Sequence, residues 1–195
     1  MVLTFDFCVL TFYNIPMLKI IQAPNPILFQ KTKEVKKIDK KIKKIIEEMK
    51  ETLLAKTDPQ GVGLAANQVG VNLSLFIIKP TKKSPISVFI NPKILKVEEE
   101  KEEKRKKKEK KLKLEGCLSV PKIWGNVKRA KKVLLEYQTD DESFEKKQAW
   151  FSGFEAVIIQ HEVDHLEGVL FTQRALAQNQ PLYEEKEGKL VKIEK

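Results

Sequence analysis

Apolar residues first recur at helical spacing in residues 39–56, DKKIKKIIEEMKETLLAK. Asp39 is a residue type that caps helix N-termini, and Asp58-Pro59 closes the segment. Polar residues, mostly lysine and glutamate, fill the opposite face, so the pattern predicts an amphipathic surface helix. The apolar face consists of Ile42, Ile45, Ile46, Met49 and Leu53.

Four later segments combine apolar runs or alternation with flanking turn residues, and this combination predicts strands. Pro80 and Pro92 lie at or near the ends of the first two. A glycine- and alanine-rich segment, GVGLAANQVG at 61–70, precedes them and suits a close approach of backbones. The four segments are LSLFIIKP (73–80), SVFINPKIL (87–95), VKRAKKVLLEYQ (127–138) and KKQAWFSGF (146–154).

A second helix is predicted from about Ser152, where the sequence GFEAVIIQHEVDHLEG begins, with Gly168 as its C-cap. The following VLFTQRAL continues the same domain, and residues 181–195 form a polar tail. The chain shows no internal repeat and no second domain. We therefore expect a single domain over residues 17–180.

Two segments stand apart from this domain. Residues 98–113, EEEKEEKRKKKEKKLK, cannot bury enough apolar surface to offset the entropy of ordering, so a solvated insert is predicted. No aromatic residue is interleaved to stack bases, and no specific nucleic-acid binding is expected. Residues 1–16 are apolar, but they carry Asp6 and lack the basic start and cleavage site of a signal peptide. We interpret them as an extension ahead of a second start at Met17 in a cytoplasmic protein.

Composition narrows the class of protein. The length of 195 residues suits one domain with a substantial core. The net charge of +10 affects solubility and the rate of encounter with charged partners, but it does not indicate a fold. Cys8 and Cys117 are too few for a disulfide framework, and a bridge between them is not expected in a reducing compartment. No run reaches the roughly 20 apolar residues that span a bilayer, so no membrane partner is expected.

Both histidines of the chain lie in QHEVDH, residues 160–165. Residues four apart share a helix face, so His161 and His165 can bind one metal ion, while Glu162 can reach a metal-bound water without being a ligand. The alternative is an amphipathic helix with two incidental histidines. Against it, an apolar run precedes the motif, and unpaired buried polar groups cost about 1–3 kcal/mol each. The pattern therefore favours a metal site.

The third metal ligand cannot be a histidine, because the chain has no other. A catalytic metal commonly has three protein ligands and an open position for water. Cys117, in a short low-charge segment between charged neighbours, is the favoured candidate. An acidic residue after the helix, Glu184 or Glu185, remains the alternative, as in some zinc peptidases.

The segments GVGLAANQ, EGCLS and QHEVDH, in this order, resemble the signature blocks of the peptide deformylase family. The similarity runs from about Met17 to about Leu176, and all three blocks are intact. The departures are the long charged insert and the N-terminal extension, neither of which interrupts a block. HExxH alone is shared with many metallopeptidases, whereas the three blocks together are specific.

The resemblance implies a role for each matching residue. Cys117, His161 and His165 would bind the metal, and Glu162 would be the general acid and base. Gln68 and the backbone N–H of Leu118 would stabilise the oxyanion, and Gly63 would contact the substrate backbone. The residues implied to line the methionine pocket are Val62, Leu118, Val157 and Ile158. A contact between Glu115 and Arg129 would hold the EGCLS segment.

The resemblance further implies an α+β fold, with antiparallel sheets wrapped around a central helix that carries HEVDH. The implied reaction is removal of the N-formyl group from formylmethionine at the start of newly made polypeptides, by a hydroxide generated on the metal, with release of formate. Ferrous iron is the implied metal, with zinc, nickel or cobalt able to substitute. The implied partners are N-formylmethionyl nascent peptides, and a transient association with the ribosome stays open.

Two other functions remain to be discriminated. A zinc endopeptidase would use His161, His165 and Glu184 or Glu185, so Glu185→Ala would lose the metal and Cys117→Ser would keep it. A non-catalytic binder would act through the lysine-rich insert, so deleting residues 98–113 would abolish its activity, whereas an enzyme would largely retain its own.

Overall fold

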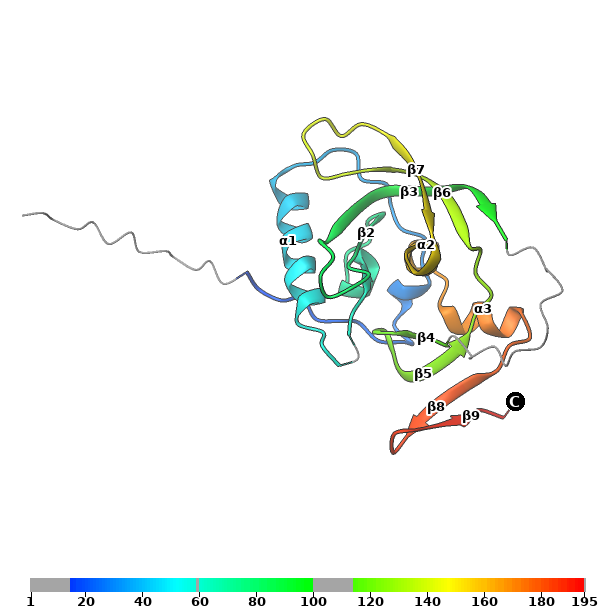
Figure 1. Cartoon of the computed structure of the whole chain (residues 1–195). Coiled ribbons are helices and arrows are strands. Elements are labelled where there is room, and N and C mark those ends of the chain that lie inside the picture. The colour runs from blue at the N-terminus through cyan, green and yellow to red at the C-terminus, as the bar shows by residue number, and fades with distance from the viewer. Residues whose placement is uncertain (1–14, 59, 100–113, 195) are drawn as a thin grey trace, which may run out of the picture.

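The computed structural model of the chain describes residues 15–58, 60–99 and 114–194. It contains two antiparallel sheets (Figure 1). The larger sheet has five strands in the order β1-β2-β3-β6-β7. These strands are β1 (Gly63–Ala65), β2 (Leu75–Ile78), β3 (Ser87–Glu98), β6 (Lys132–Gln138) and β7 (Lys147–Ser152). The smaller sheet has the order β4-β5-β8-β9, with β4 (Leu114–Cys117), β5 (Val120–Asn126), β8 (Leu182–Lys186) and β9 (Lys189–Lys192).

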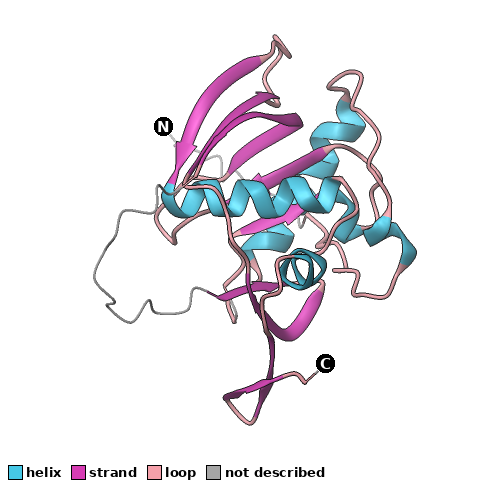
Figure 2. Cartoon of the chain, turned by 90° about the vertical axis from the view of Figure 1, so that its right-hand side faces the viewer, coloured by secondary structure: helices cyan, strands magenta, loops and turns pink. Residues whose placement is uncertain are grey.

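Helix α2 (Gly153–Leu166) lies between the two sheets, and Figure 1 views it nearly along its axis. Its apolar residues pack against the inner face of the larger sheet in a cluster that includes Phe76, Phe89 and Leu135. Figure 2, turned by a quarter turn, shows the same helix lengthwise beneath that sheet. The expected α+β fold with antiparallel sheets around a central helix is therefore confirmed.

Helix α1 (Lys40–Leu54) covers the other end of the larger sheet. The Asp39 side chain accepts a hydrogen bond from the Ile42 N–H at 2.9 Å, so the predicted N-cap is confirmed. Ile42, Ile46, Met49 and Leu53 are buried and Ile45 is partly buried, as the apolar pattern predicted. The remaining helices are short: the 3-10 helices η1 (Pro26–Phe29) and η2 (Ala66–Val69), and α3 (Phe171–Ala177).

Strand β3 differs from the prediction, because it continues through Pro92 to Glu98 instead of ending near that proline. Pairing with β6 shifts register between Ile90 and Lys93, so the missing N–H of Pro92 falls at an irregularity of the ladder. Asn91, beside it, has φ of +49° and its side chain bonds both the N–H and the C=O of Val35. The Asn91 side chain thus forms with Val35 the pair of hydrogen bonds that a paired strand residue would form.

The polar C-terminal segment forms a hairpin, β8–β9, that extends the smaller sheet through β5. Trp124 on β5 donates from Nε1 to Glu185 on β8 at 2.9 Å. Cys117 is free, while Cys8 and most of the 1–16 extension and of the charged insert lie outside the described residues. Within the part of the chain that is described, no helix has the length and apolarity needed to cross a membrane.

Gly168, directly after α2, allows the chain around η1 to approach the helix end. Its φ is +75°, and a Cβ there would lie 2.6 Å from the Phe29 carbonyl carbon. Both the Thr32 N–H and its hydroxyl donate to the last-turn carbonyl of Leu166, at 2.8 and 3.0 Å. The glycine therefore satisfies a backbone conformation and a steric limit at once.

Comparing Gly168 with Gly188 separates the cost of the backbone conformation from the cost of the steric clash. Gly188 has a similar φ of +73°, but a Cβ there meets no described atom within 4 Å. We expect Gly188→Ala to cost about 1–2 kcal/mol, the usual penalty of a left-handed conformation. Gly168→Ala should cost clearly more, because backbone atoms cannot move aside. Equilibrium urea unfolding measures both, and equal costs would contradict the steric account.

Candidate metal centre

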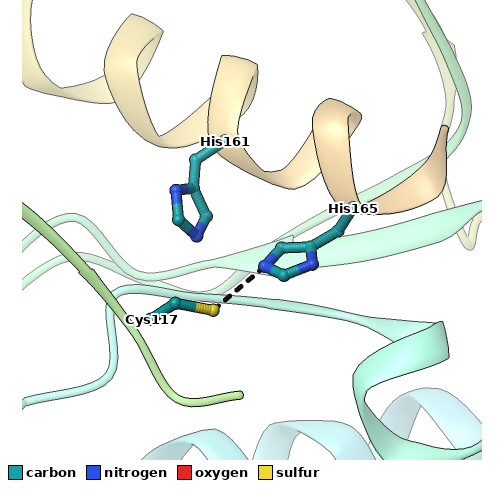
Figure 3. A group of neighbouring side chains, drawn as sticks. All are labelled: Cys117, His161 and His165. Atoms are coloured by element: carbon teal, nitrogen blue, oxygen red, sulfur yellow. Dashed lines mark hydrogen bonds between the residues drawn. The ribbon is translucent and has the colours of Figure 1, made fainter. Parts of the chain in front are cut away.

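Helix α2 and strand β4 bring three metal-ligating side chains together. His161 and His165 project from successive turns of α2, and Cys117 faces them from the end of β4 (Figure 3). Their ligand atoms all lie within 4.8 Å of one another, and Cys117 Sγ is 3.1 Å from His165 Nε2. The four-residue spacing on α2 and the position of β4 at the edge of the smaller sheet thus bring Cys117, His161 and His165 into one compact cluster.

Cys117 is placed by the tight β4–β5 hairpin. The register shifts between Gly116 and Cys117, and the chain turns back at once so that Cys117 pairs with Val120. Within this turn the N–H of Ser119 donates to Cys117 Sγ at 3.4 Å. Gly116 lies against the Trp124 ring, where a Cβ would come within 2.8 Å of the ring. The glycine of EGCLS therefore lets the strand lie flat on an aromatic side chain.

Glu115 fixes the orientation of His161. The Glu115 carboxylate lies 3.0 Å from His161 Nδ1 and accepts two hydrogen bonds from Arg129, at 2.8 and 2.9 Å. Burial raises the pKa of Glu115, but the hydrogen bonds from Arg129 and His161 outweigh it and hold that pKa at about 2. A permanently ionised carboxylate at Nδ1 leaves Nε2 of His161 to face Cys117 and the metal position.

Asp164 continues this chain of charges on the opposite side of Arg129. Arg129 donates to Asp164 at 2.6 Å, and Arg174 on α3 also donates to Asp164 at 2.6 Å. The Arg129 side chain is only 7% exposed, so it needs the two carboxylates around it, whereas Arg174 is 47% exposed. The charges of two carboxylates and two guanidinium groups thus sum to zero next to His161.

Glu162 is the one acidic side chain that this network leaves unpaired beside the cluster. It is 3% exposed, and its Oε2 has no hydrogen-bond partner among the described residues. Burial raises the pKa of Glu162 to about 7, although the charges of His161 and Arg129 oppose the rise. A carboxyl with such a pKa can both take up and release a proton near neutral pH.

Gly63 on β1 closes the space next to Glu162. A Cβ at Gly63 would lie 2.2 Å from Glu162 Oε1 and 3.0 Å from Ile158. The backbone of β1 therefore runs directly past the carboxylate. This close approach is what the glycine-rich segment at 61–70 was expected to allow.

Gln68 is held rigidly at the other side of Cys117. Its Oε1 accepts from the Ala65 N–H at 2.8 Å, which directs Nε2 toward Cys117 Sγ, 3.4 Å away, and Ser119 Oγ, 3.1 Å away. Ser119 is completely buried, and its orienting role was not predicted. Its position inside the EGCLS block was the one signal available in the sequence.

The residues expected to line the methionine pocket do not all belong to one apolar cluster. Val62 and Ile158 belong to the apolar cluster between α2 and the larger sheet, and Val157 on α2 is partly buried. Leu118 packs instead against the cluster that contains α1. The alternative ligands lie elsewhere: Glu184 pairs with Lys186, and Glu185 accepts from Trp124.

The donor set fits a divalent transition metal. One thiolate and two imidazoles are the nitrogen and sulfur ligands that zinc and iron accept, and three ligands leave a position open. The unpaired Glu162 oxygen and the Gln68 amide flank the cluster. This arrangement is that of a catalytic site rather than of a closed structural one.

Removing the charge of Glu115 tests the role of the network. We expect Glu115→Gln to weaken metal binding by about 10- to 100-fold, because an amide holds His161 less firmly than a carboxylate. Competition with a chelator, starting from zinc-loaded protein, measures the change. Glu185→Gln is the matched control on the same sheet and should bind zinc as the wild type does. Equal loss in both variants would contradict the assignment.

Comparisons with known proteins all indicate one family. The family model for polypeptide deformylase matches residues 17–180. The peptide deformylase of Dictyoglomus turgidum is 39% identical over 170 residues, which cover 87% of this chain and 99% of that protein. The crystal structure of peptide deformylase from Thermotoga maritima aligns with a TM-score of 0.69 and 35% identity, covering 81% of this chain and 97% of the other. A Met-Ala-Ser-bound peptide deformylase from Acinetobacter baumannii aligns with a TM-score of 0.68 and 32% identity, covering 81% and 98%.

Proposed function

The chain belongs to the polypeptide deformylase family, and from this premise we propose how its own side chains carry out the family's reaction. The enzyme is a hydrolase that removes the N-formyl group from N-formylmethionyl peptides. The observation that carries the assignment of roles is the buried, unpaired Glu162 carboxylate beside the Cys117, His161 and His165 cluster. The endopeptidase alternative loses its support, because its acidic ligands are engaged on β8.

Cys117, His161 and His165 would hold the metal ion, with Glu115 orienting the first histidine. A divalent ion in such a site acts as a Lewis acid that makes water nucleophilic near neutral pH. We assign ferrous iron as the working metal, with zinc, nickel or cobalt able to replace it. The mixed thiolate and imidazole set is compatible with each of these ions.

Glu162 would move the proton in the reaction. Its raised pKa lets it take a proton from the attacking water and return it to the departing amine, which releases formate and a free methionyl terminus. The carboxylate lies against the β1 backbone at Gly63, so this strand limits its movement on that side. The same residue thus acts as base and then as acid.

Gln68 and the backbone N–H of Leu118 would stabilise the negative charge that develops on the formyl oxygen. Gln68 Oε1 is bonded to Ala65, so its Nε2 is already directed at the site before substrate arrives. Pre-oriented donors of this kind contribute about 2.7–4 kcal/mol each to transition-state stability. Ser119 positions Gln68 and does not touch the substrate in this account.

The substrate would lie between β1 and β4. Gly63 would bind the peptide backbone, and Val62, Leu118, Val157 and Ile158 would contact the methionine side chain. Leu118 lies in the turn after β4, whereas Val62 precedes β1. The pocket would therefore be formed from both sheets and α2.

The partners follow from the substrate. Newly made polypeptides that begin with formylmethionine are produced on ribosomes, so we propose a cytoplasmic enzyme that associates with the ribosome transiently. The charged insert at 98–113 is not required for the chemistry in this proposal, because none of the assigned residues lies in it.

Formate release from a formyl-methionyl tripeptide tests these roles, using protein purified without oxygen and loaded with iron. Glu162→Ala should lose about 10²- to 10⁴-fold in turnover, because proton transfer then falls to water. Gln68→Leu should lose about 10²- to 10³-fold in kcat through the missing oxyanion donor. Cys117→Ser should lose both iron and turnover.

Two controls accompany this assay. Glu185→Ala should keep both metal and turnover, and deletion of residues 98–113 should leave most of the turnover intact. A wild-type protein that is inert with iron, zinc and nickel alike would overturn the proposal. Retention of metal in Cys117→Ser with loss in Glu185→Ala would restore the endopeptidase alternative.

A further inference from the structure

The two histidines of the proposed metal site differ in the hydrogen bonding of their Nδ1 atoms. His161 has the Glu115 carboxylate at Nδ1, whereas Nδ1 of His165 has no hydrogen-bond partner in the described part of the chain. His165 is 1% exposed, so bulk water cannot reach this atom. An unpaired N–H at such a depth costs about 1–3 kcal/mol, which makes the atom a feature that needs an explanation.

The proton of a neutral imidazole sits on the nitrogen that does not bind the metal. Nε2 of His165 faces Cys117 Sγ at 3.1 Å and is therefore the ligand atom in the proposed site. Nδ1 must then carry the proton and needs an acceptor. The metal-binding tautomer of His165 thus creates a buried donor.

Asn67 on η2 offers the complementary group. Its Nδ2 donates to the backbone carbonyl of His165 at 2.6 Å, so the two residues are already in contact. Its Oδ1 is buried and accepts no hydrogen bond from any described residue. One unpaired donor and one unpaired acceptor therefore belong to two residues that are already joined by a hydrogen bond from the Asn67 side chain to the His165 backbone.

We propose that Asn67 is a positioning residue for the metal ligand His165, an inference that rests on the metal site of the proposed function. Nδ2 donates a hydrogen bond to the carbonyl of His165. Oδ1 accepts a hydrogen bond from one buried water, and that water accepts the hydrogen bond that Nδ1–H of His165 donates. Buried waters typically occupy such positions between otherwise unsatisfied polar groups. Asn67 then does for His165 what Glu115 does for His161, with a neutral group in place of a charged one.

The backbone around Asn67 is suited to this role. Its carbonyl accepts from the Gly70 N–H at 3.2 Å, and the next residue, Gln68, is bonded back to Ala65. Asn67 is 1% exposed, so its side chain has little freedom to turn away. One short helix thereby supports a metal ligand through Asn67 and supplies an oxyanion donor through Gln68.

The chain has only two histidines, so a long-range proton–nitrogen NMR spectrum of the zinc-loaded protein contains two imidazoles. We expect both to be protonated at Nδ1. Asn67→Leu, which removes both polar atoms at similar volume, should shift the Nδ1–H resonance of His165 and speed its exchange with water, while His161 is unaffected. Glu115→Gln should do the reverse.

Zinc release to a chelator gives the second readout. Asn67→Leu should release zinc about 10-fold faster or more, the usual size of such effects on metal binding. Asn72→Leu is the matched control. Asn72 also has a buried Oδ1 without a hydrogen-bond partner among the described residues, but it forms no hydrogen bond with His165 there. If Asn67→Leu fails to fold by circular dichroism, Asn67→Ser takes its place, since a hydroxyl can bond the water but is too short to reach the carbonyl. It should give a smaller shift of the His165 resonance.

The outcomes are separable. If zinc binds and Asn67→Leu changes neither the His165 resonance nor the release rate beyond the Asn72→Leu control, the positioning role is overturned while the deformylase roles stand. If zinc does not bind to the wild type at all, both fail together. If zinc binding behaves as described but formate release is absent, the positioning role survives without the proposed reaction.

Discussion

The structure depends on the cost of taking polar side chains out of water. Helix α2 is enclosed between two sheets, yet it carries two histidines, a glutamate and an aspartate within five residues. Each of these groups requires a partner at that depth. The surrounding elements can be understood as the means of supplying those partners: β4 brings Glu115 and Cys117, the segment after β5 brings Arg129, and α3 brings Arg174.

Of the buried carboxyl groups near the candidate metal site, Glu115 and Asp164 have charged partners and Glu162 has none in the described structure. Arg129 lies between two carboxylates, and the four charges of that network cancel behind His161. Glu162, one residue further along the helix, has no cation bonded to its Oε2 in the described structure. Its pKa therefore rises by desolvation while that of Glu115 falls. The pKa values of the two carboxyl groups, one on β4 and one on α2, are therefore shifted in opposite directions.

Much of this could be read from the sequence. Helix α1 with its Asp39 cap, the helix of HEVDH and four of the strands followed from periodicity and capping residues alone. The pairing of strands could not, because it depends on contacts between distant segments, and β3 passes through Pro92 only because Asn91 and a register shift accommodate it. The contact between Glu115 and Arg129 was predicted from the resemblance, but the other side chains around the histidines were missed. Ser119 and Asn67 each make a hydrogen bond, and Asp164 several, that no spacing rule encodes, and Arg174 has no motif around it.

The three residues of the candidate metal site come from parts of the chain that are synthesised at different times. Cys117 and His165 are 48 positions apart, and the cysteine belongs to the smaller sheet while the histidines belong to the helix under the larger one. Closing a loop of that length carries an entropic cost that must be met before any donor atom gains a neighbour. A growing copy of this protein therefore cannot bring these three side chains together until residue 165 has left the ribosome.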